Sequence, residues 1–348
     1  MVKQQRAMLV FTVVLLCVSL LVGCSGGQQS GGTSKPATPA APQTKEYKIN
    51  IATATTGGVY YPLGNALAQI WSKNLPGVKA SAQSTAGTPQ NIELMKAKEA
   101  DVAFGQNGIA YYAYFGQGTY EGKPVKTIRG MLALYPNVMH MVVRKGAGIK
   151  SVADLKNKRF VPGQVGSATE INGREILGVY GLNYQKEKGE VNVKADFVGY
   201  NEAADLLKDG HTDAILIAGG LPTSSVMDVL ASGKAELIPI EPDKIKEITQ
   251  KYPWYFEITI PKGTYSNQTQ DIKTVAVSNI LMVREDLDEE LVYKLTKATY
   301  DYHNDLVAAH KAAKDTTLEH AMDGMTIPVH PGAAKYFKEK GIKVPDIK

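Results

Sequence analysis

The spacing of hydrophobic and polar positions changes several times along the chain. Residues 47–51 alternate polar and apolar side chains, which is typical of a strand with one buried face. Leu63, Leu67, Ile70 and Trp71 then recur at helical spacing. The segment between them, residues 52–64, is small and rich in hydroxyls and glycine. This part of the chain therefore predicts a strand, a tight turn and a helix.

The same unit is predicted again further along. Strands are expected at 78–83, 101–104, 130–135, 138–143, 159–161, 194–198, 213–217, 235–240 and 275–283. Helices are expected after the turns 84–89, 105–108, 163–169 and 218–224, and over 287–302 and 317–322. Ser151 and Asp154 have the spacing of a capping box, and Asn201 is expected to cap a helix.

Alternating strands and helices predict an α/β fold with mainly parallel sheets flanked by helices. The body is longer than one core usually serves, so two domains are expected. The predicted crossings between them fall near 137–146 and 271–284. Domain I is then discontinuous, built from 47–140 and 276–348, and domain II covers 141–275. A ligand would lie in the cleft between them, at the carboxyl ends of the strands.

The first residues read as a targeting signal. Lys3 and Arg6 precede an uncharged apolar run over 7–22, which is short for a membrane span and typical of a signal peptide. The run ends in Leu-Val-Gly-Cys at 21–24, which resembles the lipobox of bacterial lipoproteins. That resemblance implies a signal peptide over 1–23 and lipidation of Cys24. A plain secretory signal or an uncleaved anchor is the alternative.

Composition and net charge exclude further classes of function. Residues 24–46 are dominated by Gly, Ser, Gln, Pro, Ala and Thr and read as a flexible linker. The net charge of +5 falls to +3 without Lys3 and Arg6, which does not suggest a nucleic-acid binder. The two cysteines are Cys17 and Cys24, so no thiol remains in the body for a disulfide, a metal or catalysis. No metal site and no cofactor are expected.

Hydroxyls, amides and glycines gather where strands are predicted to end. Such groups, together with helix N-termini, bind carboxylates or phosphates without a formal positive charge. Each turn by itself could be purely structural. The ligand-binding residues expected from this pattern and from the resemblance given next are Thr53, Thr56, Gly57, Gly58, Val59, Tyr60, Thr85, Gln106, Ser167, Ala168, Thr169, Gly220 and Thr223. Thr55, Gly87, Thr88, Asn107 and Gly219 belong to the same turns.

Four segments resemble the TAXI family of solute receptors of tripartite ATP-independent periplasmic (TRAP) transporters. They are 56–64 (TGGVYYPLG), 166–172 (GSATEIN), 260–265 (IPKGTY) and 330–336 (HPGAAKY). The resemblance implies a two-domain periplasmic-binding-protein fold of type II, with a hinge crossed twice. It also implies capture of a glutamate-like solute or a dicarboxylate such as 2-oxoglutarate. The partner would be an ion-coupled TRAP permease. Residues 217–221 and 107–109 depart from the family's pattern.

The function expected from the sequence is therefore a lipid-anchored extracytoplasmic solute receptor, acting as a monomer. The alternative is a binding protein of the same fold that serves an ABC importer of thiamine precursors or sulfonates. An enzyme is not expected, because the chain has no Gly-x-Ser-x-Gly elbow, no cysteine in the body and no metal-ligand spacing.

Overall fold

The structure, a computed structural model, describes residues 45–348. The predicted signal peptide and Cys24 lie outside the described residues. Within the described range, no helix combines the length and the apolar character needed to cross a membrane.

The strands follow the predicted order closely. Their bounds are β1 Tyr47–Ala52, β2 Val78–Gln83, β3 Val102–Gln106, β4 Ile128–Arg144, β5 Arg159–Val161, β6 Lys194–Ala195, β7 Ala214–Gly219, β8 Ala235–Ile238, β9 Tyr255–Ile260 and β10 Ile272–Arg284.

The helices carry the apolar positions that recur at helical spacing. Their bounds are α1 Tyr60–Asn74, α2 Thr88–Lys96, α3 Asn107–Phe115, α4 Ala168–Val179, α5 Tyr200–Lys208, α6 Ser224–Ala231, α7 Pro242–Lys251, α8 Glu289–Asp301, α9 His303–Ala309 and α10 Pro331–Glu339.

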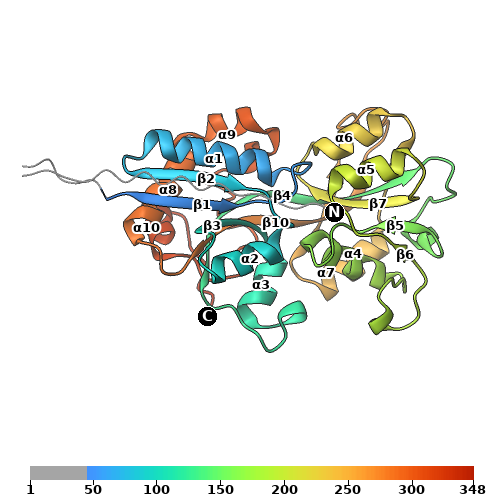
Figure 1. Cartoon of the computed structure of the whole chain (residues 1–348), viewed down its shortest axis with the longest axis horizontal. Helices are drawn as coiled ribbons and strands as arrows, with labels where there is room; N and C mark the ends of the chain where they lie inside the picture. The colour runs from blue at the N-terminus through green and yellow to red at the C-terminus, as the bar shows by residue number, and fades with distance from the viewer. Residues whose placement is uncertain (1–44) are drawn as a thin grey trace, which may run out of the picture. The chain divides into compact units, whose positions relative to one another are not determined.

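The strands form one hydrogen-bonded path with helices on both faces. The order is β2-β1-β3-β10-β4-β7-β5-β6, with β8 paired to β4 and β9 paired to β10. Figure 1 shows α1 on one side of β1 and β2 and α2 on the other, with α5 and α4 on opposite sides of β7. The predicted α/β fold, with helices flanking a sheet, is confirmed.

The sheet is mixed rather than mainly parallel. β1 pairs in parallel with β2 and β3, and β5 pairs in parallel with β6 and β7. The long strands β4 and β10 instead pair antiparallel with each other and with every other neighbour. The strand–helix alternation predicts the parallel pairs well. It does not predict the antiparallel pairing of β4 and β10, because their partner strands are far apart in sequence.

Two of the core clusters draw mostly on the ranges predicted for domain I. One joins α1, α8 and α10 to the sheet and includes Trp71, Phe104 and Phe337. The other lies beneath α2 and α3. Two further clusters draw mostly on the range predicted for domain II. The described residues, 45–348, form one compact unit by contact, so the division at 140/141 and 275/276 stays a prediction.

Three local predictions differ from the structure. The strands expected at 130–135 and 138–143 are the single strand β4, which passes Pro136 where β10 shifts register beyond Ser278. Asn201 is not a cap, since Gly199 precedes α5 and Tyr200 begins it. Residues 317–322 are turns instead of a helix. The preceding Thr316 donates its hydroxyl to the Leu134 carbonyl of β4 at 2.8 Å, which ties this segment to the sheet.

Candidate ligand-binding site

The turn from β1 into α1 presents open backbone donors. Gly58 N–H donates to the Thr55 carbonyl at 3.1 Å, and Gly57 N–H donates to Thr55 Oγ1 at 3.3 Å. Among the described residues, no side chain caps the start of α1. The N–H groups of its first turn are therefore available to an acceptor, at the positive end of the helix dipole.

The turn into α2 has the same character. Gly87, with φ of 102°, precedes the helix, and the described residues supply no side-chain cap. Gly87 N–H donates to Thr85 Oγ1 at 3.0 Å. Thr88 Oγ1 accepts from the Gln106 N–H at 3.1 Å, so its own hydroxyl proton is free to donate elsewhere.

A third helix start comes from α4. Ser167 Oγ accepts from the Glu170 N–H at 3.2 Å, as expected of an N-cap serine. Thr169 Oγ1 lies 2.5 Å from the Tyr200 hydroxyl, which donates to the Ala218 carbonyl at 2.9 Å. Because Tyr200 gives its proton to Ala218, Thr169 donates to Tyr200. Thr169 therefore holds this tyrosine in place through its hydroxyl.

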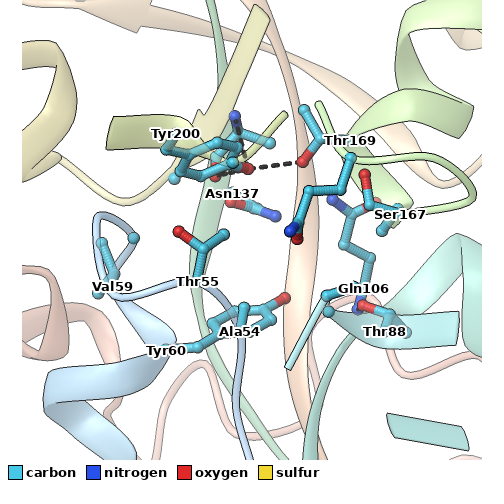
Figure 2. Close-up of a pocket in the computed structure, with 18 of the residues that line it drawn as sticks. Ala54, Thr55, Val59, Tyr60, Thr88, Gln106, Asn137, Ser167, Thr169 and Tyr200 are labelled. Atoms are coloured by element: carbon cyan, nitrogen blue, oxygen red, sulfur yellow. Dashed lines mark hydrogen bonds between the residues drawn. The ribbon is translucent and has the colours of Figure 1, made fainter. Parts of the chain in front are cut away.

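These three turns meet around one cavity of about 40 Å³. Figure 2 shows Thr55, Val59 and Tyr60 on one side of this space, Thr88 and Gln106 on another, and Ser167, Thr169 and Tyr200 facing them. Ser225 N–H donates to the Gly57 carbonyl at 3.4 Å, and a Cβ at Gly57 would lie 2.2 Å from Asn201 Oδ1. The α1 turn and α5 are therefore in close contact here, and a larger residue at Gly57 would require the exposed Asn201 side chain to move.

The lining of this cavity is polar but, over the described residues, uncharged. The hydroxyls of Thr55, Thr88 and Ser167 each accept a backbone N–H and keep a proton to donate. Gln106 Oε1 and the Tyr135 hydroxyl are buried and have no hydrogen-bond partner among residues 45–348. Unsatisfied buried polar atoms are costly, so a solute that accepts from the Tyr135 hydroxyl would be favoured. Gln106 Oε1 is an acceptor and would need a donor group instead.

The tyrosines of the cavity are protonated at neutral pH. Burial raises the pKa of Tyr60, Tyr135 and Tyr200 above the usual value of 10. The Tyr60 hydroxyl donates to Asn279 Oδ1, and the Tyr200 hydroxyl is satisfied as described. Tyr135 is therefore the tyrosine of this group that retains a proton to donate to a solute.

Seven predicted residues line the cavity. Gly58, Val59, Tyr60, Gln106, Ser167, Ala168 and Thr169 come together from three separate turns. The convergence expected from the sequence is thus present in the structure. That these residues bind a ligand stays a prediction.

Six predicted residues do not line it. Thr53 is fully buried and donates to the Gln83 carbonyl at 2.6 Å, and Thr85 is hydrogen-bonded to Asn91 at 2.7 Å. Thr223 donates to the Gly220 carbonyl at 2.6 Å. Thr56 is exposed and Gly57 contacts α5, while Gly220 packs against the Tyr135 ring. Five of the six thus have structural roles, and Thr56 is exposed.

The remaining lining residues include four turn residues that the sequence already offered as pocket candidates and four that it did not. Thr55, Gly87, Thr88 and Gly219 stand in the predicted turns and do line the cavity. Tyr135, Asn137, Gln164 and Tyr200 line it as well. Tyr135 and Asn137 lie within β4, where the strand pattern gives no hint of a site. Across the part of the chain that the structure describes, no group of His, Cys, Asp and Glu could hold a metal ion.

Comparison with known families corrects the assignment made from the turns. The sequence model of the NMT1-like family matches residues 51–341. The resemblance to the TAXI family is therefore wrong, and with it the expected TRAP permease. The four segments that suggested it lie at a turn or at the start of a helix.

Several solved structures are similar to this chain in fold. A protein from Bordetella bronchiseptica RB50 is 21% identical, with a TM-score of 0.51, covering 86% of this chain and 91% of that one. The periplasmic aliphatic sulphonate binding protein SsuA from Escherichia coli is 16% identical, with a TM-score of 0.47, covering 85% and 84%. The alkanesulfonate-binding protein SsuA from Xanthomonas axonopodis pv. citri, bound to MOPS, is 13% identical, with a TM-score of 0.44 and the same coverage. The likeness to the Bordetella protein shows the fold alone. The family match confirms the expectation that the chain is not an enzyme.

Proposed function

Because the chain belongs to the NMT1-like family, we propose that it is the extracytoplasmic solute-binding component of an ABC importer and that it captures a small oxyanion. The family assignment favours the importer that the sequence analysis keeps as its alternative. Lipidation of Cys24, in the sequence Leu-Val-Gly-Cys at 21–24, belongs to this proposal. The mass of the mature N-terminal peptide tests it.

One observation carries the proposal. Three helix starts from distant parts of the chain converge on one cavity that has hydroxyl and N–H donors and no charged side chain among the described residues. Helix N-termini bind anions through their free N–H groups and their dipole. A neutral lining supports an anion held by several hydrogen bonds instead of a single ion pair.

The size of the cavity supports a small head group. About 40 Å³ corresponds to roughly three water molecules. A carboxylate or sulfonate group is of this size. A dicarboxylate or an aromatic thiamine precursor is larger than this space. An ammonium group, as in glutamate, would also lack a carboxylate partner in the lining.

The oxyanion is tested by thermal unfolding with matched pairs of probes. Methanesulfonate is compared with uncharged dimethyl sulfone, and acetate with acetamide, at constant ionic strength. We expect at least one anion to raise the melting temperature while its neutral partner does not. A hundredfold excess over Kd would contribute about 2.7 kcal/mol. Equal shifts from each anion and its neutral partner, or none from either anion, would refute the oxyanion site. The anion that gives the larger rise in melting temperature shows whether the site prefers a sulfonate or a carboxylate.

Neighbouring threonines supply a matched pair of variants. Thr55 lines the cavity and Thr56 is exposed in the same turn. Thr55→Val removes one donor at nearly constant shape, so the affinity for the anion should fall about tenfold, which corresponds to about 1.4 kcal/mol. Thr56→Val should leave Kd within twofold of wild type. Isothermal titration measures both constants, and an equal loss in the two variants would contradict the site assignment.

The importer is tested by uptake of the same anion into cells that express the chain with its transporter subunits. Uptake should stop when ATP is depleted and persist when the ion gradients are collapsed. The opposite pattern would reject an ABC partner while leaving the binding site itself untouched.

A further inference from the structure

A second, much larger cavity of about 1050 Å³ lies beside the first. The start of α3, the segment leading into β9 and the loop 315–326 surround it, and β4 and β10 form its inner wall. Tyr135 is the one residue that lines both cavities among those described. Small-molecule sites in proteins typically measure about 300–1000 Å³, so this space is large enough for a solute of several rings.

Four aromatic side chains of the lining form one cluster. Tyr111 and Tyr112 come from α3, and Tyr252 and Trp254 come from the segment before β9. The Trp254 ring lies 4.8 Å from the ring of Tyr112, 5.9 Å from that of Tyr111 and 5.7 Å from that of Tyr252, centroid to centroid. All four side chains are half-buried. Part of each ring is therefore left uncovered at the spacing where aromatic groups attract one another.

The inner wall offers an unsatisfied donor. Asn279 of β10 lines the large cavity and is fully buried. Its Oδ1 accepts from the Tyr60 hydroxyl, which fixes the orientation of the amide. Its Nδ2 has no hydrogen-bond partner in residues 45–348. A buried donor without a partner is costly, so a solute with an acceptor at this end of the cavity would be favoured.

The charges around the cavity nearly balance. Lys251, Asp315, His320 and Asp323 belong to its lining. His320 Nδ1 lies 2.8 Å from Asp323 Oδ2, and this contact raises the pKa of the histidine, which favours its charged form. The lining therefore favours no strongly charged solute, in contrast to the anion-binding character of the smaller cavity.

We propose that the large cavity is a second ligand site, which binds a neutral planar aromatic solute whose carbonyl oxygen accepts from Asn279 Nδ2. The planar ring of the solute packs against the uncovered parts of the aromatic cluster that Trp254 and Tyr112 belong to. Asn279 sets its orientation. The two cavities share Tyr135 and no other described lining residue, so we expect a molecule bound in one to leave the other open.

The probe is benzamide, with cyclohexanecarboxamide as its saturated counterpart. Both carry the same carbonyl, and benzamide alone has the flat ring. Nuclear magnetic resonance titration of the full chain should give a Kd for benzamide at least fivefold lower than for cyclohexanecarboxamide. Methanesulfonate should not displace benzamide. Equal affinities, absence of benzamide binding at millimolar concentration, or displacement by methanesulfonate would overturn the proposal.

Substitutions in the aromatic cluster test whether benzamide binds in the large cavity. Trp254→Leu should weaken benzamide binding at least fivefold, and Tyr252→Leu should weaken it in the same direction. Met227→Ala, at an exposed position on α6, is the matched control and should leave Kd unchanged. Thermal unfolding of each variant shows whether it is folded. Unchanged affinity in both aromatic variants would overturn the site. The comparison of Kd between benzamide and cyclohexanecarboxamide uses the wild-type chain, so it tests the proposal even if a variant does not fold.

Discussion

Glu175→Gln is expected to remove a pH-dependent loss of stability on the order of 3 kcal/mol. Glu175 is 6% exposed, and burial raises the pKa of its carboxyl from 4.5 to about 7. Tyr255 donates to Oε2 at 2.6 Å and Tyr112 donates to Oε1 at 3.1 Å, which only partly offsets the desolvation. Tyr112 belongs to α3 and Glu175 to α4, so the carboxyl links two helices far apart in sequence.

The sign of the effect follows from the two pKa values. The folded state binds the proton of Glu175 more tightly than the unfolded chain does. Its stabilising contribution is therefore complete below pH 4.5 and is lost as the pH rises through about 7. Glutamine stays neutral and can still accept from Tyr112. Relative to wild type, the variant should gain stability steadily between pH 5 and pH 8.

The effect of Glu175 has to be measured as the difference in unfolding free energy between wild type and variant, because His140 also makes stability depend on pH. Burial lowers the pKa of this histidine from 6.5 to about 4. Its contribution is present above pH 6.5 and lost as the pH falls through 4, which opposes that of Glu175 over part of the same range. The unfolding free energy of wild type alone, measured against pH, therefore understates the contributions of Glu175 and His140. Urea unfolding at pH 5, 6, 7 and 8 should be compared between wild type and variant.

The matched control is Glu187→Gln, at an exposed position. Its difference from wild type should stay flat across this pH range. A flat difference for Glu175→Gln as well would show that the buried carboxyl is not the source of the pH dependence.

Gly332→Ala is expected to destabilise the protein by about 3 kcal/mol, at the upper end of the usual cost of overpacking. Gly332 follows Pro331 at the start of α10, where His330 Nδ1 accepts its N–H at 3.2 Å. A Cβ there would lie 2.2 Å from the carbonyl oxygen of Glu289 and 2.9 Å from the backbone nitrogen of Tyr293, both in α8.

This clash cannot be relieved by a side-chain rotation, because both neighbours are backbone atoms. The two helices would have to separate, which loosens the buried contacts of Tyr336 and Phe337 in the core beneath them. Gly178→Ala in α4 is the matched control, since a Cβ there meets nothing within 4 Å. That variant should gain about 0.5–1 kcal/mol, because alanine favours the helix over glycine. A loss below 1 kcal/mol for Gly332→Ala in urea unfolding would contradict the close packing.

The sequence predicts much of the candidate site but not its final membership. Ser167 is recognisable as a cap, and the turns at 55–60 and 163–169 are visible from their glycines and hydroxyls. Which hydroxyl of a turn faces the solute depends on a backbone rotation of one residue. Thr55 faces the cavity and Thr56 faces solvent for this reason. The family assignment failed for a related reason, since local motifs report backbone conformation more directly than they report ancestry.

By itself, the sequence determined the order of strands and helices, because the period of apolar positions records which face of each element is buried. It also determined the glycine turns and helix caps, since these are local backbone requirements. The tertiary structure alone decided that β4 and β10 are long antiparallel strands and that Tyr112 meets Trp254 and Glu175. Such pairings depend on packing between segments far apart in the chain, for which no local pattern of residues carries a signal.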